Sequence, residues 1–350
     1  MVYLDEFSEF DSHRGLFSFV LDIGTKKTRG FVGLHRGNES IPAFGATRYA
    51  RYAQEEDAIQ DVLRLSRMMS YKSAFAKVKY AGAKAVILDQ DSFTEADKKK
   101  FLIEYARAIN LLRGAFVTGS DVGLSGKDVK LLRKHSEYIV GAKIDATTYT
   151  GKGLNAALRA SLPIVFETED LSNKTIAIQG LGKVGQAFLD HTVKEAKQIF
   201  VTDTDQERLV AIAKKYKTVH ALDPEEIFSA PADIFAPCAL AGALTPHTAQ
   251  ILNAKLVLGG ANNQLSDLSV ADLLHSRGIT YIPDYVANAG GFLSVVHEYD
   301  HGGRNIKKLD QKIAEIGKHT KQLLKESQKK STPPAKIADG IAEEWIKHKY

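Results

Sequence analysis

Residues 174–193, KTIAIQGLGKVGQAFLDHTV, decide the fold of the chain. The segment KTIAI is typical of a short buried strand, and the residues after the turn have the pattern of a helix. Between them, Gly180, Gly182 and Gly185 stand in the spacing Gly-x-Gly-x-x-Gly. The first glycine permits a tight bend, the second lets backbone amides approach a pyrophosphate, and the third lets the helix pack on the strand. The stretch therefore predicts a dinucleotide-binding turn.

An acidic residue ends the next predicted strand, QIFVTD, at about the twenty-residue distance expected for this motif. Asp203 can accept hydrogen bonds from the adenosine ribose, and its charge would repel a 2′-phosphate. The predicted cofactor is therefore NAD rather than NADP, with Asp205 as the competing candidate for the ribose role. Lys183 and Val184, between the second and third glycines, complete the predicted cofactor-binding turn.

Strands and helices continue to alternate after this turn. The helix QERLVAIAKKY follows, and ADIFAPC, KLVLGGANN and TYIPDY are later apolar strands separated by helices or turns. Such alternation is typical of parallel β-α-β units. We therefore predict a doubly wound Rossmann NAD-binding domain over residues 146–325.

The part of the chain before residue 146 has a different order of predicted elements: paired short strands, helices and a buried strand. The predicted elements are antiparallel strands within 15–35, helices at 55–80 and 91–112, a strand at 83–88, and a strand, glycine-rich loop and helix start within 114–132. They predict an α/β domain with a mixed sheet. A polar, proline-containing loop at 327–336 precedes a last helix that we expect to pack on this domain, so its predicted limits are 1–145 and 326–350.

Composition excludes several classes of protein. Lys and Arg number 47 and Asp and Glu 42, and this excess of five is spread along the chain, which argues against nucleic-acid binding. No apolar run reaches the roughly 20 residues of a membrane helix. The single cysteine, Cys238, excludes an internal disulfide and fits the reducing cytoplasm. The acidic start MVYLDEFSEF predicts no signal peptide, and the 11 histidines show no metal-ligand spacing.

Several ordered motifs together resemble the glutamate/leucine/phenylalanine/valine dehydrogenase family, leucine dehydrogenase most of all. They are SYKSAFAKVKYAGAKAVIL, TGSDVG, IAIQGLGKVG, IFVTDTD, DIFAPCAL, GGANNQL and IPDYVANAGG. The resemblance covers nearly the whole chain and is strongest over residues 171–300. It implies NAD-dependent interconversion of an apolar L-amino acid with its 2-oxo acid and ammonia. It also implies a homo-oligomer, a dimer or an octamer, whose contacts come from the first domain.

The resemblance assigns three catalytic groups. Lys72 and Lys84 match the two active-site lysines of the family, and Asp121 matches its aspartate. Lys72 would hold the substrate carboxylate, Lys84 would activate water as a base, and Asp121 would carry a proton to and from the substrate nitrogen. A desolvated lysine beside another cation loses affinity for its proton, which suits Lys84 to this role.

The resemblance also implies the residues around the reacting atoms. Those on the cofactor side are Thr148, with Thr147 nearby, Cys238, Ala239, Asn263 and Asn288. Those on the substrate side are Phe44, Gly45, Met69, Gly119, Asn262, Phe292 and Val295, with Val286 as a further wall residue. Cys238 is interpreted as a packing residue, because hydride transfer needs no nucleophile.

The chain departs from the family in ways that bear on activity and substrate. Alanines replace glycines at Ala46, Ala81 and Ala83, and we expect their methyl groups to crowd the substrate carboxylate. Phe44 and Phe292 stand where leucine-type enzymes have smaller residues. They either shrink the pocket, which favours valine or leucine, or stack on an aromatic substrate of the phenylalanine type. A catalytically impaired NAD-binding paralogue is the remaining alternative.

Overall fold

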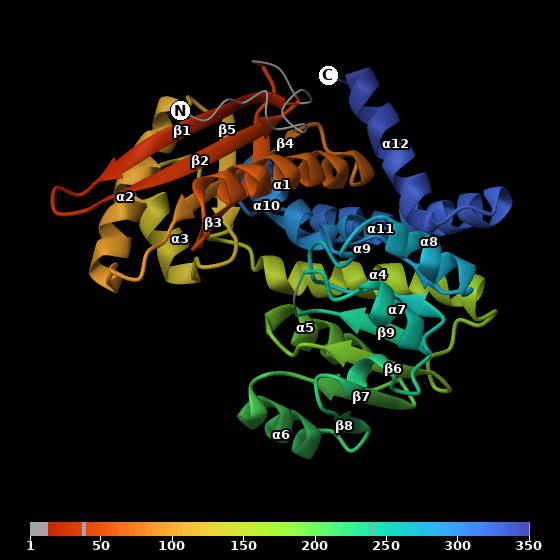
Figure 1. The fold of residues 1–350 in the computed structure, drawn as a ribbon. Coiled ribbons are helices and arrows are strands. Elements are labelled where there is room, and N and C mark those ends of the chain that lie inside the picture. Colours follow the sequence, from red (N-terminus) through yellow and green to blue (C-terminus); the bar gives the residue numbers. More distant parts are fainter. Residues whose placement is uncertain (1–12, 37–39, 240, 350) are drawn as a thin grey trace. The chain divides into compact units, whose positions relative to one another are not determined.

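Two compact units make up the chain in the computed structural model, which describes residues 13–36, 40–239 and 241–349 (Figure 1). The first consists of Met1–Ile144, Val295–Arg304 and Ile341–Tyr350, and the second of Asp145–Ser294 and Asn305–Gly340. Compared with the predicted domains, residues 295–304 join the first unit and residues 326–340 join the second. Within the described ranges, no helix combines the length and the apolar character that a membrane span requires.

The first unit contains a five-stranded mixed sheet in the order β1-β2-β4-β3-β5. Its strands are β1 (His13–Asp22), β2 (Lys27–His35), β3 (Ala43–Ala50), β4 (Ala81–Leu88) and β5 (Phe116–Ser120). β1, β2 and β4 pair antiparallel, which confirms the antiparallel strands predicted within 15–35, while β3 runs parallel to both β4 and β5. β3, the strand that joins the two halves of the sheet, was not predicted from the sequence.

Helices cover both faces of this sheet (Figure 1). They are α1 (Glu55–Phe75) on one face and α2 (Glu95–Leu111) and α3 (Gly126–Arg133) on the other, with the end of α10 (Ala289–His301) and most of α12 (Pro334–Lys349) also in this unit. The helix predicted over 55–80 is five residues too long. Lys77 adopts the left-handed conformation, with φ of 51°, and a helix cannot continue through that conformation.

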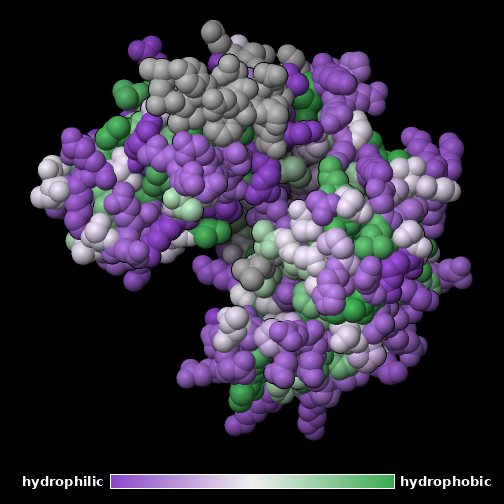
Figure 2. Space-filling view, in the orientation of Figure 1, coloured by the Kyte–Doolittle hydropathy of each residue, from purple (hydrophilic) through white to green (hydrophobic). Residues whose placement is uncertain are grey.

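The sheet separates two hydrophobic cores, and β4 contributes to both by alternation. Ala81, Ala83 and their alternate neighbours pack in the core with α2, whereas Val86 packs in the core with α1. Lys84 therefore points to the α1 face, away from the methyl groups of Ala81 and Ala83. The predicted crowding by these two alanines is wrong for this reason. Figure 2 shows hydrophilic side chains over most of the visible face of each unit.

The second unit contains a six-stranded parallel sheet in the order β11-β10-β9-β6-β7-β8. Its strands are β6 (Thr175–Gln179), β7 (Gln198–Thr202), β8 (Val219–Ala221), β9 (Ile234–Pro237), β10 (Leu256–Val257) and β11 (Thr280–Tyr281). The chain starts at the central strand β6 and adds β7 and β8 on one side of it. It then returns to the other side of β6, where it adds β9, β10 and β11. This is the doubly wound Rossmann topology, as predicted, and ligands bind such sheets beyond the carboxyl ends of the strands.

Helices connect these strands and complete the second unit. They are α4 (Ala146–Val165), α5 (Lys183–Thr192), α6 (Gln206–Lys215), the 3-10 turn η3 (Glu226–Phe228), α7 (Pro246–Ile251), α8 (Ser269–Ser276), α9 (Asp284–Ala287) and α11 (Ile306–Lys330), with the start of α10. The loop predicted at 327–336 is shorter in the structure. α11 continues to Lys330, and only three residues separate it from α12, where Pro334 suits a first helical turn.

A buried glutamate fixes the backbone of residues 141–144, where the first segment of the first unit ends. Glu298, on α10, accepts four backbone N–H bonds of 2.9–3.2 Å from the consecutive residues 141–144. Its side chain is 1% exposed, and Arg133 lies 3.7 Å away. The division of the chain into units falls after Ile144 and, within α10, after Ser294, so this one carboxylate joins two segments of the first unit that lie next to these divisions in the sequence.

Candidate active site

The glycine-rich turn has the geometry that its spacing predicts. Gly180 has φ of 92°, which a residue with a side chain rarely adopts. A Cβ on Gly185 would lie 1.9 Å from the carbonyl oxygen of Gly180, so the close approach of α5 to β6 requires a glycine there. A Cβ on Gly182 would meet no atom within 4 Å. The second glycine therefore faces open space at the start of α5.

Asp203 lies against this turn, at the end of β7. Its carboxylate accepts hydrogen bonds from the Leu181 amide at 2.6 Å and the Asp205 amide at 2.9 Å, and Arg208 contacts it at 3.2 Å. Burial would raise the pKa of Asp203, but these donors outweigh it and lower the pKa below its usual value. Asp205 instead caps α6 through the Arg208 amide at 3.0 Å.

The carboxyl ends of the central strands also present polar atoms without partners. Gln179 Oε1 and Thr202 Oγ1, on the last residues of β6 and β7, are buried and have no hydrogen-bond partner among the described residues. The N-terminus of α5 has no side-chain cap. Free amides at a helix N-terminus favour an anion. Together with the open space at Gly182, these features fit a bound dinucleotide.

The remaining predicted cofactor-side residues of the second unit form two groups. Cys238 is half-buried beside exposed Ala239, and burial raises the pKa of the Cys238 thiol to about 11, so the thiol is protonated at neutral pH. Asn288 donates from Nδ2 to Asn262 Oδ1 at 3.1 Å, while its own buried Oδ1 has no partner in the described chain. Asn263 adopts a left-handed conformation, and its amide donates to Asp284 at 2.6 Å.

The other predicted cofactor-side residues lie in the first turns of α5 and α4. Lys183 is exposed and Val184 half-buried in the first turn of α5. Thr148 lies in the first turn of α4, where its hydroxyl donates to the capping carboxylate of Asp145 at 2.6 Å. The Thr147 amide donates to the same carboxylate at 3.1 Å.

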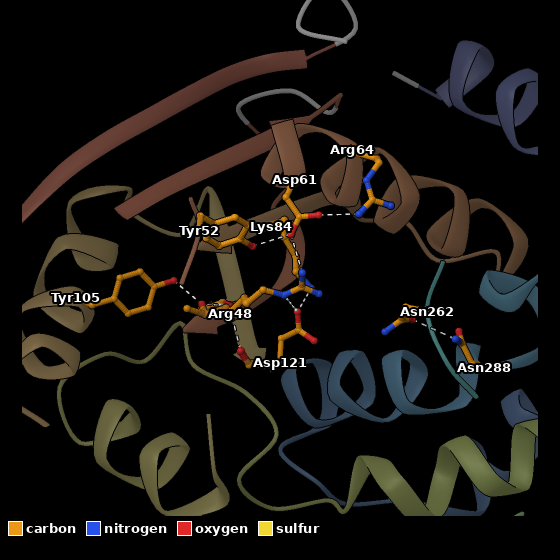
Figure 3. A network of polar contacts seen from close by, with 12 residues as sticks. Arg48, Tyr52, Asp61, Arg64, Lys84, Tyr105, Asp121, Asn262 and Asn288 are labelled. Carbon is orange, nitrogen blue, oxygen red and sulfur yellow. Dashed lines mark hydrogen bonds and ion pairs between the residues drawn. The ribbon is translucent and has the colours of Figure 1, made fainter. Parts of the chain in front are cut away.

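In the first unit, the structure brings together two of the three predicted catalytic groups (Figure 3). Lys84 Nζ on β4 lies 2.5 Å from Asp121 Oδ2, just beyond β5, and the two side chains are 6% and 12% exposed. Burial would raise the pKa of Asp121, but Lys84 and Arg48 overcome this effect and hold the pKa well below its usual value. Asp121 is therefore ionised and paired.

Lys72 lies in the last turn of α1, on the helix that packs over the Lys84 face of the sheet. The contact is close because Gly82 has no side chain: a Cβ there would lie 2.1 Å from the Ser70 amide. Ser70 Oγ accepts a hydrogen bond from the Gly82 amide at 2.9 Å. Lys72 itself is half-buried. Its position is thus fixed two residues beyond the point where α1 contacts β4.

The predicted substrate-side residues divide between the units. Phe44, Gly45, Met69, Gly119 and Val295 belong to the first unit, and Asn262, Val286 and Phe292 to the second. The Phe44 ring is fully buried, with its centroid 4.3 Å from that of Tyr80 and 5.1 Å from that of Tyr299. A Cβ on Gly45 would lie 1.9 Å from the Ala83 carbonyl oxygen, so this position requires glycine. Phe292 and Val286 are buried, and Met69 and Val295 half-buried.

Two charged residues of this site were not predicted from the sequence. Arg48, on β3, contacts Asp121, and Asp61, on α1, contacts Arg48. The available signal was an arginine within the small and aromatic residues of FGATRYA, since a charge in a buried strand requires a partner.

Comparison with known proteins matches both units. Residues 17–138 match the family model described as Glu/Leu/Phe/Val dehydrogenase, dimerisation domain, and residues 141–344 match Glutamate/Leucine/Phenylalanine/Valine dehydrogenase. Leucine dehydrogenase of Bacillus subtilis is 34% identical over 311 residues, which cover 87% of this chain and 84% of that protein. The chain belongs to the Glu/Leu/Phe/Val dehydrogenase family.

Other members of this amino-acid dehydrogenase family differ in the substrates they are named for. Phenylalanine dehydrogenase of Lysinibacillus sphaericus is 38% identical and aligns with 73% of this chain and 70% of its own length. The crystal structure of L-tryptophan dehydrogenase from Nostoc punctiforme superposes with a TM-score of 0.81 at 30% identity, covering 99% of each chain. The family is therefore established, and its range of substrates includes both aliphatic and aromatic amino acids.

Proposed function

We propose that this chain catalyses the NAD-dependent oxidative deamination of an apolar L-amino acid of the leucine or valine type, and the reverse reductive amination. The amino acid, NAD⁺ and water would give the 2-oxo acid, ammonia, NADH and a proton. The main support is the buried ion pair of Lys84 and Asp121, the two residues that the sequence resemblance assigns to catalysis.

Each catalytic group has a role that its chemistry suits. Bound NAD would supply the acceptor for the hydride that leaves Cα. Lys72 would bind the substrate carboxylate, and Lys84, in the form that has lost its proton, would remove a proton from the water that attacks the imine carbon. Asp121 would hold or release a proton at the substrate nitrogen, because an ionised carboxylate accepts hydrogen bonds from an ammonium group. Asn262 and Asn288 would orient the substrate and the nicotinamide amide.

The residues around the glycine-rich turn support NAD rather than NADP as the cofactor. The turn of Gly180, Gly182 and Gly185 would hold the pyrophosphate, and Asp203 would accept bonds from the adenosine ribose. An ionised Asp203 would repel a 2′-phosphate. Asp205 is the weaker candidate because its carboxylate caps α6, whereas the Asp203 carboxylate contacts the glycine-rich turn through the Leu181 amide.

We expect Asp203→Ser to lower the preference for NAD over NADP by about 10²-fold, in the range of one removed charge repulsion of about 2–3 kcal/mol. Arg208, released from Asp203, would then be able to face a 2′-phosphate. The measurement is kcat/KM for each cofactor with the best amino acid. Asp205→Asn is the matched control, and a change of preference in that variant alone would assign the ribose to Asp205.

The aromatic residues of the first unit bear on substrate size. Because the Phe44 ring is buried against Tyr80 and Tyr299, it cannot easily move aside, which supports a small aliphatic side chain. An aromatic substrate is the second candidate. It is supported by the 38% identity to a phenylalanine dehydrogenase and the similarity to L-tryptophan dehydrogenase.

The proposal is tested by measuring NADH production at alkaline pH with a panel of L-amino acids. We expect turnover of valine, leucine and isoleucine, at rates at least about tenfold above phenylalanine and tryptophan, since one misfitting group costs about 1–3 kcal/mol. Faster turnover of phenylalanine or tryptophan would favour the second candidate. Turnover of none, with NADH still bound in a fluorescence titration, would indicate a catalytically impaired paralogue.

We further propose a homo-oligomer, a dimer or an octamer, in the cytoplasm. The match of residues 17–138 to a model described as a dimerisation domain supports the assembly. β1 is an edge strand of its sheet and exposes Phe17 and Val20. Apolar side chains on an edge strand favour association with another chain. The single cysteine fits a reducing compartment.

A further inference from the structure

A chain of charged side chains extends from the Lys84–Asp121 pair into the first unit (Figure 3). Arg48 Nε lies 3.2 Å from Asp121 Oδ2, the same oxygen that Lys84 contacts. The other end of the same guanidinium, Nη1, lies 2.6 Å from Asp61 Oδ2. Arg48 therefore contacts one carboxylate at each end of its planar group.

The far end of this chain is itself held in place. Asp61 accepts a hydrogen bond from the Tyr52 hydroxyl at 2.7 Å and contacts Arg64 at 2.6 Å. The side chains of Arg48 and Asp61 are 19% and 12% exposed. Because a guanidinium is rigid and always charged, two such contacts fix both its position and its direction.

The three groups nearest to the proposed chemistry come from three adjacent strands. Lys84 is on β4, Arg48 on β3 and Asp121 directly after β5, in the sheet order β4-β3-β5. The register places Arg48 opposite Val86, two residues beyond Lys84 on the same face. Asp121 is joined to β3 by its amide, which donates to the Thr47 carbonyl at 3.0 Å. The arrangement thus depends on the sheet as well as on the side chains.

We propose that Arg48, anchored by Asp61, is a positioning residue of the reaction: it orients the Asp121 carboxylate and keeps it ionised beside Lys84. This inference rests on the proposed function. Without Arg48, Asp121 would keep Lys84 as a cationic partner but would lose the contact that fixes its direction. The carboxylate would then hold a proton more readily, because an opposite charge within hydrogen-bond distance favours the ionised form.

The test compares the pH dependence of kcat/KM in the wild-type enzyme and in Arg48→Gln, on the best substrate of the panel. In Arg48→Gln we expect kcat to fall by about 10–100-fold. We also expect the acid limb of the pH profile, where the rate falls at low pH, to move to higher pH by about one unit. The acid limb moves to higher pH because the loss of a neighbouring cation makes deprotonation harder for the group that limits the rate at low pH. KM for NAD should not change, since the dinucleotide-binding turn belongs to the other unit.

Two further variants separate charge from position. Arg48→Lys keeps the cation but cannot contact both carboxylates with a planar fork, so we expect the wild-type acid limb with a rate reduced by about three- to tenfold. Asp61→Asn removes an anion beside Arg48, so its acid limb should move to lower pH. Arg51→Gln is the matched control: Arg51 pairs with Asp89 and Asp91, is 57% exposed, and should leave both kcat and the limb unchanged.

An unshifted acid limb in Arg48→Gln overturns the inference, whether the rate is retained or is lost together with thermal stability. The second of these results would give Arg48 a structural role only. A wild-type enzyme that turns over no amino acid overturns the proposed function and this inference with it. The two failures are therefore distinguishable by the wild-type measurement.

Discussion

We expect the replacement of Lys84 by alanine to lower amino-acid oxidation by at least about 10³-fold while NADH still binds. General acid–base catalysis contributes about 10²–10⁴-fold, and Lys84 is the proposed base. We expect the substitution to lower the rate of the reaction and not the affinity for NADH, because Lys84 is buried beside Asp121 in the first unit. Cofactor binding is retained because Gly180, Gly182 and Asp203 belong to the second. Turnover is measured with the best amino acid, and binding by NADH fluorescence titration.

Two comparisons make the Lys84 result specific. Lys84→Met retains the apolar stem of the side chain, so a similar loss of rate assigns the effect to the amine rather than to a cavity. Lys79→Ala removes a lysine whose side chain is 67% exposed and should retain nearly the full rate. A Lys84→Ala enzyme with unchanged kcat would show that the base is elsewhere.

The conformation of the glycine-rich turn was predictable because its geometry is local. The positive φ of Gly180 and the contact of Gly185 with Gly180 arise within six residues of each other, so spacing alone specifies them. The alternation of strands and helices likewise predicted the parallel sheet. The face of β4 could have been deduced in the same way, since residues 81 and 83 alternate with Lys84 along one strand.

The network around Asp121 was not predictable, because its contacts depend on strand order. Arg48 is 73 positions from Asp121 in the sequence and 13 positions from Asp61. It contacts Asp121 because β3 lies between β4 and β5 in the sheet. β3 itself, AFGATRYA, contains three alanines and a glycine that weaken the alternation typical of a strand. The resemblance to a family supplied Lys84 and Asp121, but no local pattern pointed to their neighbours.

The contacts of Glu298 were also not predictable from the sequence, and we expect a large effect when they are removed. We expect Glu298→Ala to lower the free energy of unfolding of the first unit by about 3 kcal/mol or more. Four backbone N–H groups would lose a charged acceptor, and a buried donor without a partner costs about 1–3 kcal/mol. Water entering the space left by the side chain recovers part of this loss. Urea unfolding followed by circular dichroism measures the change.

Glu298→Gln distinguishes the lost acceptors from a lost volume. Glutamine nearly fills the space of glutamate, but its amide has one acceptor oxygen and an NH₂ that would face N–H donors. We therefore expect it to be destabilised almost as much as the alanine variant. Glu344→Ala, at an exposed position of α12, should lie within about 0.5 kcal/mol of the wild type. A glutamine variant as stable as the wild type would mean that one acceptor oxygen suffices, and that residues 141–144 keep their conformation without the second carboxylate oxygen.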